Sequence, residues 1–255
     1  MISKEIIFKT FSEMGLSSND VVMIHGDAGP AAQIKCNAGE SQLAEFIRIL
    51  VCFFSNGTVL VPSFTYSSIK NESFDPLLTE SKVGLFSEYF RHYSGVTRSS
   101  HPIFSFSVYG KNKDKYIDTS LNDCFGVGTT FDEFYKANGK ILCIGCSLDR
   151  STFIHYVEQK INVSYRYFKN FQSSVITNGS KHELVTRYFV RDLNLDTSTE
   201  LSLLKTNALS SNKLIESNLG RFPVTSISAH DFFYIANELY KTNPYSLINQ
   251  RICNG

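Results

Sequence analysis

Apolar residues recur along the first 170 positions with two different spacings. Between residues 40 and 54 they fall every third or fourth position, which predicts a helix with one buried face. Those positions are Leu43, Phe46, Ile47, Leu50, Val51 and Phe54. Short apolar runs at 21–24, 58–61, 104–109 and 140–145 predict strands, and they alternate with helical patterns at 3–14, 83–93 and 130–137. The alternation predicts an α/β fold, with a mixed, mostly parallel central sheet flanked by helices.

The pattern changes after about residue 170. Two strand-like runs, 173–176 and 183–190, flank Asn178-Gly179, a dipeptide typical of tight hairpin turns. The stretch 192–212 is rich in Ser, Thr and Asn, and it predicts a surface excursion with a short helix, while 229–241 predicts a closing helix. We therefore expect one domain over 1–255, within which 170–215 form an added antiparallel hairpin and a surface excursion.

Charge and composition exclude several classes of function. The 25 Lys and Arg against 24 Asp and Glu give a net charge of +1, which offers no basic excess for nucleic acid or a membrane surface. No apolar run approaches the roughly 18 residues of a membrane-spanning helix. The start, Met1 to Glu5, resembles the beginning of a helix rather than a signal peptide, so we expect a cytoplasmic protein.

Six widely spaced cysteines do not form the dense framework of a small secreted domain. They lie at 36, 52, 124, 143, 146 and 253. Cys143 and Cys146 form a CxxC, but Cys143 falls inside a predicted strand rather than at a helix start, and no second CxxC completes a zinc site. Buried, reduced cysteines are the favoured interpretation, with no metal.

The most informative stretch is Ser151 to Glu158, which follows the apolar run ending at Gly145. A strand, a turn and a Ser/Thr-initiated helix often build a site in α/β proteins. His155 and Glu158 are three residues apart and share one helix face, so the carboxylate can orient the imidazole as a general base. Hydroxyls or backbone N–H groups near Thr152 could stabilise an oxyanion. The alternative is an ordinary pair on the helix surface.

Three predicted strand ends carry further candidate residues. His25-Gly26-Asp27-Ala28-Gly29 could bring backbone N–H groups close to a ligand, and Lys35 could pair with a phosphate. Pro62 to Tyr66 supplies the hydroxyls of Ser63, Thr65 and Tyr66, and the stretch from Arg98 and Ser99 to Ser105 suits an anion or a polar ligand. Each has a structural alternative: an ordinary loop, a solvated lysine, simple turn chemistry and a capped loop around His101-Pro102.

Taken in order, segments over residues 10–170 resemble the aminoglycoside 3-N-acetyltransferases and their relatives. The matching pieces include Met23-Ile24-His25, 57–65, Phe74-Asp75-Pro76, 98–102, Gly126-Val127-Gly128-Thr129, Thr152 with His155 and Glu158, and Tyr165-Arg166. One departure is the first loop, which usually has His-Ser-Ser in the family and has His25-Gly26-Asp27 here. The missing side chain at Gly26 suggests the hypothesis of room for an acyl group larger than acetyl.

The resemblance implies a coenzyme-A-dependent acyltransferase with a large α/β fold, using acetyl-CoA or 3-hydroxybutyryl-CoA as co-substrate. His155 would take the proton from the attacking amine and Glu158 would orient it, with Thr152 beside them. The predicted coenzyme A contacts are Gly26, Asp27, Lys35, Arg98, Ser99 and Ser105. The predicted substrate contacts are Ser63, Thr65, Tyr66, Tyr165 and Arg166.

The near-neutral charge bears on the acceptor, because an enzyme for polycationic aminoglycosides is expected to carry a negative field. Residues 160–190 instead hold Lys160, Arg166, Lys169, Lys181 and Arg187. We therefore expect a small-molecule acceptor that is a dTDP-linked amino-deoxysugar, acylated for a surface polysaccharide such as lipopolysaccharide O-antigen. The alternatives are an aminoglycoside 3-N-acetyltransferase conferring antibiotic resistance and a non-catalytic coenzyme-A- or carbohydrate-binding protein. A homo-oligomer stays open.

Overall fold

The computed structural model describes residues 1–193 and 197–249. It contains a seven-stranded sheet in the order β3-β4-β2-β1-β5-β9-β8. Its strands are β1 (Val21–Gly26), β2 (Thr58–Pro62), β3 (Thr97–Arg98), β4 (Phe106–Gly110), β5 (Lys140–Ile144), β8 (Leu214–Leu219) and β9 (Phe222–Ser228). The helices are α1 (Lys4–Glu13), α2 (Gln42–Phe53), α3 (Leu85–Arg91), α4 (Asp114–Ile117), α5 (Thr130–Lys136), α6 (Phe153–Ile161), α7 (Ser202–Ser210) and α8 (Ala229–Thr242).

The middle of the sheet is parallel and its two sides are antiparallel. β1 pairs in parallel with both β2 and β5, whereas the pairings with β4, β3, β9 and β8 are antiparallel. The carboxyl ends of β1 and β5 therefore lie side by side, with Gly26 opposite Ile144. Loops that leave these ends are the usual place for a site in an α/β protein.

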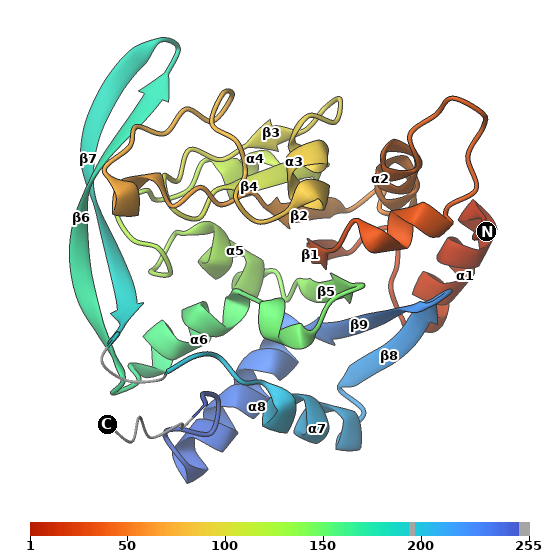
Figure 1. Ribbon diagram of the computed structural model, residues 1–255. Coiled ribbons are helices and arrows are strands. Elements are labelled where there is room, and N and C mark those ends of the chain that lie inside the picture. The colour runs from red at the N-terminus through yellow and green to blue at the C-terminus, as the bar shows by residue number, and fades with distance from the viewer. Residues whose placement is uncertain (194–196, 250–255) are drawn as a thin grey trace.

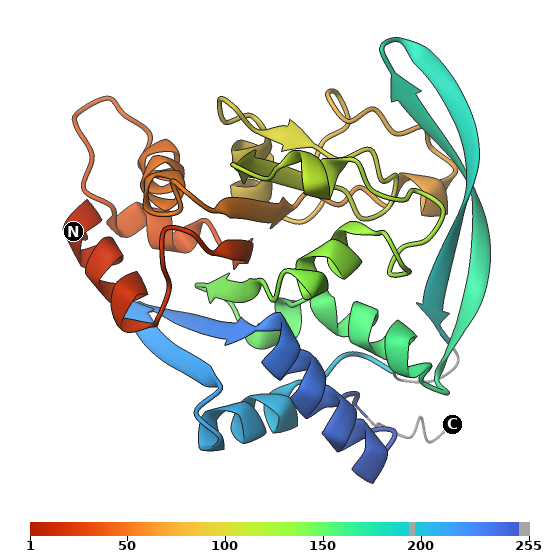
Figure 2. The same ribbon diagram turned by 180° about the vertical axis from the view of Figure 1, so that it is seen from behind.

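Helices cover both faces of the sheet (Figure 1 and Figure 2). Side chains alternate between the faces along each strand. On β1, Val22 and Ile24 pack with α1, α2 and α3, whereas Met23 packs with α5, α6 and α8 on the other face. The expected α/β sandwich with a mixed sheet is confirmed, and parallel pairing is confined to the three central strands.

A long hairpin stands apart from the central sheet, as Figure 1 shows. Strands β6 (Arg166–Thr177) and β7 (Ser180–Arg191) form a two-stranded sheet of their own. Asn178 and Gly179 have φ values of 50° and 75°, which is the conformation that makes this dipeptide a tight hairpin turn. The hairpin was expected, but its strands extend to Arg166 and Arg191, beyond the predicted ends.

The C-terminal part contains elements that the polarity pattern did not predict. β8 and β9 form a second hairpin that completes the edge of the central sheet beside β5. The helix expected within 192–212 is α7, and Leu204 and Ala208 on it are buried in the core.

Cys36, Cys52, Cys124, Cys143 and Cys146 are free thiols, and Cys253 lies outside the described residues. Among the residues that the structure describes, no helix combines the length and apolarity that a membrane crossing requires.

Candidate active site

The chain reaches the candidate site through the connection from β5 to α6. A short 3₁₀ helix, Leu148–Arg150, is capped by the Ser147 hydroxyl, and α6 begins directly after it at Phe153. One face of α6 is packed in the core, and Glu158 lies on that buried face. The helix ends at Asn162, whose φ of 55° is left-handed, so that the chain turns back and β6 starts beside α6.

Glu158 is completely buried and has three partners. Its carboxylate lies 2.6 Å from Nδ1 of His155 and accepts a hydrogen bond of 2.9 Å from the Tyr165 hydroxyl. Nε of Arg166 lies 2.8 Å from the same carboxylate. Burial alone would raise the pKa of Glu158, but His155 and Arg166 hold it below its ordinary value. A buried carboxylate can stay charged here because a guanidinium compensates it.

This environment defines the state of His155. Because Glu158 is a carboxylate, Nδ1 of His155 carries the proton and donates it, which leaves Nε2 as the basic nitrogen. Removal of the ring from water lowers the pKa of His155, and Arg166 acts in the same direction, while Glu158 opposes both. Nη2 of Arg166 lies 3.0 Å from Nδ1 and acts there as a neighbouring positive charge rather than as a hydrogen-bond donor, because Nδ1 already carries a proton. His155 is therefore a neutral, oriented base at neutral pH.

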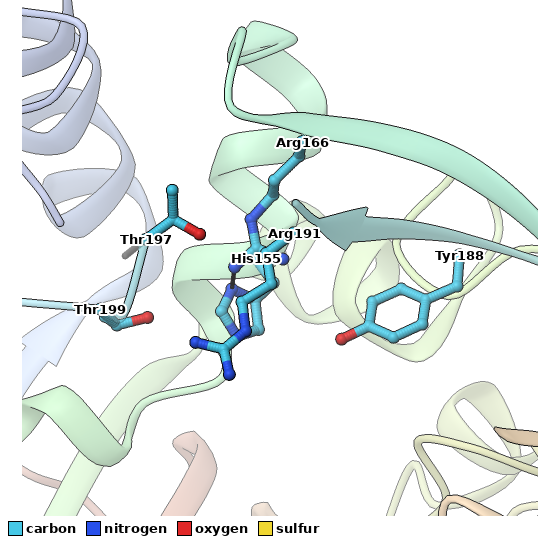
Figure 3. A pocket seen from close by; sticks show the side chains of 6 residues that line it. All are labelled: His155, Arg166, Tyr188, Arg191, Thr197 and Thr199. Carbon is cyan, nitrogen blue, oxygen red and sulfur yellow. Dashed lines mark hydrogen bonds between the residues drawn. The ribbon is translucent and has the colours of Figure 1, made fainter. Parts of the chain in front are cut away.

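The imidazole opens onto a cavity of about 160 Å³. The residues that line it are His155, Arg166, Tyr188, Arg191, Thr197 and Thr199. In Figure 3 the hydroxyls of Thr199 and Tyr188 point from opposite sides toward the space around Arg191. Thr197 is buried, and its Oγ1 has no hydrogen-bond partner among the described residues. A base, two guanidinium groups and the hydroxyls of Tyr188, Thr197 and Thr199 thus face one small space.

Arg98 and Ser105 lie in a different, fully packed cluster. The Arg98 guanidinium donates to Oγ of Ser105 and to the carbonyls of Thr79 and Ser63, and it lies over the ring of Phe74. Oγ of Ser105 in turn donates to the Ser63 carbonyl at 2.7 Å. Ser99 is also buried, and its hydroxyl accepts from a backbone N–H of β4. These side chains join the loop before α3 to the sheet.

The hydroxyls after β2 are likewise bonded within the protein. Oγ of Ser63 lies 2.6 Å from Oγ of Ser107, and Oγ1 of Thr65 donates to the carbonyl of Pro102. Tyr66 has a left-handed φ of 58° and packs edge-on against Phe64 and Phe104. The structure does not bring these residues into the lining of the His155 cavity.

The loop after β1 lies at the carboxyl end of the parallel strands. A Cβ added at Gly26 would lie 2.7 Å from the Phe86 ring. The hypothesis that Gly26 makes room for a larger acyl group is therefore wrong, because Phe86 already fills that space. The Asp27 carboxylate accepts from the N–H of Gly29 at 2.7 Å. Lys35 is exposed, and its N–H bonds to the carbonyl of Ile2 near the N-terminus.

The start of α6 leaves one hydroxyl without a partner. Thr152 precedes the helix with helical backbone angles and makes no side-chain cap. The neighbouring Ser151 is almost completely buried, and its Oγ has no hydrogen-bond partner among the described residues. Both hydroxyls lie within four residues of His155, on the segment that the sequence singled out for an oxyanion.

Four cavity residues were not predicted from the sequence: Tyr188, Arg191, Thr197 and Thr199. The hairpin turn contained the signal for Arg191. Counting residue pairs outward from Asn178-Gly179 places Thr177 opposite Ser180 and, at the far end, Arg166 opposite Arg191. An arginine predicted to contact substrate thus had a second arginine across the ladder. Thr197 and Thr199 reach the cavity through tertiary packing, and no local pattern in the sequence predicts that placement.

Comparisons with known proteins bear on this geometry. A protein-family model described as aminoglycoside 3-N-acetyltransferase matches residues 32–241. The chain is 31% identical over 113 residues to an aminoglycoside N(3')-acetyltransferase-like protein, YokD, of Bacillus subtilis, an alignment that covers 44% of this chain and 40% of that protein. It is 22% identical over 200 residues to aminoglycoside N(3)-acetyltransferase IX of Micromonospora chalcea, which covers 71% and 70%. The match to YokD thus spans about two fifths of that protein's length.

A solved structure shares the fold over nearly the whole chain. AAC-IIIb with CoASH superposes with a TM-score of 0.79 at 19% identity, covering 94% of this chain and 97% of that one. The expectation of a dTDP-linked amino sugar for O-antigen or lipopolysaccharide is wrong, because the family model and the relatives are all described by aminoglycosides. Net charge misled because it averages over the surface, whereas an acceptor contacts only a few side chains. Since the family model covers most of the chain, the protein belongs to the aminoglycoside 3-N-acetyltransferase family.

Proposed function

We propose that the protein is a coenzyme-A-dependent N-acetyltransferase that acetylates an amine of an aminoglycoside. The observation that carries the proposal is the neutral, oriented His155, held by Glu158 and facing a cavity on the family's fold. An ammonium group must lose a proton before it can attack a thioester, and a base with a pKa near or below neutral accepts that proton. The family membership supports the aminoglycoside acceptor.

The co-substrate supplies an activated acetyl group as a thioester. The chain's residues would then act in order. Nε2 of His155 takes a proton from the bound ammonium, and Glu158 stabilises the imidazolium that forms. Hydroxyls of Ser151 and Thr152, or N–H groups at the start of α6, stabilise the oxyanion as the amine attacks. His155 finally returns its proton to the departing thiolate, and the nitrogen releases its second proton to solvent as the amide forms, so that the base is regenerated and free CoASH is released.

For the coenzyme A contact we propose the loop of Gly26 and Asp27, which ends β1 beside the end of β5. Arg98, Ser99 and Ser105 already have partners within the protein, so we assign them to holding the loop before α3. Tyr165 and Arg166 act behind His155 through Glu158, and Arg166 also reaches the acceptor cavity. Since acetyl-CoA is a cytosolic metabolite, we propose that the reaction takes place in the cytoplasm.

A thiol-release assay tests the proposal. Purified protein is given acetyl-CoA with gentamicin, sisomicin or no acceptor, and free CoASH is followed with a thiol reagent. We expect acceptor-dependent thiol release and a product one acetyl group heavier by mass spectrometry. Acceptor binding without thiol release would instead favour a non-catalytic binding protein, and release that does not depend on acceptor would indicate a thioester hydrolase.

A further inference from the structure

A buried thiol lies near the carboxyl end of β5, in the middle of the central sheet. Cys143 lies opposite His25 on β1 and opposite Thr225 on β9, and Figure 1 shows these three strands side by side. Cys143 packs on the same face of the sheet as Met23, beneath α5, α6 and α8. Because side chains alternate along a strand, His25 shares this face with Met23. The thiol therefore has polar neighbours within the interior.

Cys146 approaches this thiol from the turn after β5. Gly145 has a left-handed φ of 72°, and a Cβ there would lie 2.7 Å from Pro30, so the chain turns sharply at this glycine. Sγ of Cys146 donates a hydrogen bond of 3.2 Å to the carbonyl of His25. Cys146 is partly exposed, whereas Cys143 is completely buried. Of the two thiols, Cys146 is therefore the one that a reagent reaches from solvent.

The two thiols interact with each other and differ in reactivity. The interaction with Cys143 lowers the pKa of the Cys146 thiol, and the same interaction, together with burial, raises the pKa of Cys143. The thiolate is the form of cysteine that attacks a disulfide. Cys146 thus combines access with thiolate character, and Cys143 lies behind it as a second thiol. Burial, which the sequence predicted for the cysteines, holds for Cys143 and not for Cys146.

The turn that carries Cys146 also holds the loop after β1. The N–H of Asp27 donates to the carbonyl of Ile144 at 3.0 Å, and Sγ of Cys146 donates to the carbonyl of His25. The residues on both sides of Gly26 are therefore bonded to the end of β5 and to the turn that follows it. A sulfur in a disulfide carries no proton, so oxidation of Cys146 would remove one of these two hydrogen bonds.

We propose that Cys143 and Cys146 form a redox-active dithiol, which a low-molecular-weight disulfide oxidises reversibly to an intramolecular disulfide. The Cys146 thiolate attacks one sulfur of the disulfide RSSR, forms a mixed disulfide and expels RS⁻. The Cys143 sulfur then attacks the Cys146 sulfur and expels the second RS⁻. The protons of the two protein thiols end on the two released RSH molecules, so that RSSR is reduced as the protein is oxidised.

Oxidation is expected to weaken the binding of acetyl-CoA. This consequence rests on the proposed function, in which the loop of Gly26 and Asp27 contacts coenzyme A. Loss of the weak hydrogen bond to His25 predicts a rise in KM for acetyl-CoA of about twofold. The value of kcat should stay the same, because the contacts of His155 with Glu158 involve neither cysteine.

Mass spectrometry of a single peptide tests the disulfide. Trypsin cleaves after Lys140 and Arg150, and the peptide 141–150 contains both cysteines and no other. The folded protein is treated with oxidised glutathione, its free thiols are blocked with N-ethylmaleimide, and it is digested. We expect this peptide to carry no label and to be about 2 Da lighter than the dithiol form. Dithiothreitol added before the blocking step should restore both labels.

Variants separate the roles of the two cysteines. Cys143→Ala should stop the reaction at the mixed disulfide, so that Cys146 keeps glutathione. Cys146→Ser should leave Cys143 unmodified, because that thiol is buried. Cys52→Ser is the control, since it removes another partly exposed cysteine and should leave the disulfide in peptide 141–150 unchanged.

Three outcomes would count against these statements, and each can be told apart. Labels on both cysteines after glutathione treatment, or glutathione that stays on Cys146 of the wild type, would overturn the dithiol. A disulfide that leaves KM for acetyl-CoA unchanged would overturn its effect on the loop. An absence of acetyl transfer by the reduced protein would overturn the proposed function, whereas the peptide result would still stand.

Discussion

Two arginines in this protein are equally buried and have opposite surroundings. Arg98 and Arg166 each expose 8% of their surface. Arg98 donates to the carbonyls of Thr79 and Ser63 and to one hydroxyl, and its side chain meets no carboxylate at ion-pair distance among the described residues. Arg166 contacts the Glu158 carboxylate and the ring of His155, and it reaches a cavity. One guanidinium joins loops, whereas the other adjusts a titratable group.

The difference teaches that residue type and burial do not identify a functional arginine. Burial lowers the pKa of Arg98 to about 10, so it stays protonated, and backbone oxygens replace the water that it loses. The positive charge of Arg166 pairs with the Glu158 carboxylate. It lowers the pKa of His155, which Glu158 alone would raise. A functional arginine is distinguished from a structural one here by the groups that its guanidinium contacts and by whether it faces a cavity.

The largest effect on activity is expected for His155, which faces the cavity together with Arg166. His155→Ala removes the base and should lower kcat by about 10²–10⁴-fold. The free energy of unfolding should fall less than in Glu158→Gln, because Arg166 and Tyr165 still contact the buried Glu158 carboxylate. Thiol release and urea unfolding measure the two quantities, and His182→Ala, on the exposed hairpin, is the control that should change neither. A His155→Ala protein with full activity would remove this residue from the mechanism.

The second effect, a loss of stability, is expected when Arg98 is replaced. Arg98→Met keeps much of the side-chain volume but leaves the carbonyl of Thr79 and the hydroxyl oxygen of Ser105 without their donor, while the Ser63 carbonyl keeps its hydrogen bond from Ser105. Each buried group left unpaired costs about 1–3 kcal/mol, so we expect a loss of roughly 3 kcal/mol in the free energy of unfolding. Activity per folded molecule should be retained. A stable Arg98→Met protein that has lost activity would instead assign Arg98 to substrate or coenzyme binding.

A smaller effect on kcat is expected for Glu158, whose carboxylate contacts both His155 and Arg166. Glu158→Gln keeps the shape of the side chain but removes the charge that stabilises protonated His155. We expect kcat to fall by roughly 10–100-fold and stability to fall as well, because Arg166 is left as an uncompensated buried cation. The kcat of the folded fraction is the measurement. A loss of stability with full activity would show that orientation by Glu158 is unnecessary.

The smallest effect is expected for Tyr165→Phe, which removes only the hydrogen bond to the far oxygen of Glu158. A hydrogen bond to a charged group contributes about 1.5–3 kcal/mol to stability. We expect a loss in that range with kcat reduced only a few-fold, because the contacts of His155 and Arg166 with Glu158 remain. A larger kcat loss than in Glu158→Gln would mean that Tyr165 touches the substrate directly.

Local sequence patterns predicted some parts of the structure and not others. The spacing of His155 and Glu158 on one helix face and the Asn178-Gly179 turn were sufficient to predict the pair and the hairpin. The partners of Arg98 were not predictable, because the carbonyls that it binds come from loops 19 and 35 residues away along the chain. The β8–β9 hairpin was also missed, since the residues next to Gly220 in its turn are Leu219 and Arg221 rather than an asparagine, and since polar residues interrupt the apolar pattern of β8.

The acceptor shows a different limit. Net charge is a property of the whole surface, and it led to an anionic substrate that the family comparison overturns. Arg191 and the two threonines come to line the His155 cavity only through tertiary contacts.

The central claim, that Glu158 and Arg166 together set the pKa of His155 as the base, is tested most directly by the pH dependence of kcat. His155 acts when unprotonated, so kcat should rise with pH through its pKa, and burial and Arg166 place that acid limb below the ordinary 6.5. Arg166→Gln should move the limb to higher pH and Glu158→Gln to lower pH, because the two side chains shift the pKa in opposite directions. An acid limb that stays in place in both variants would contradict the account.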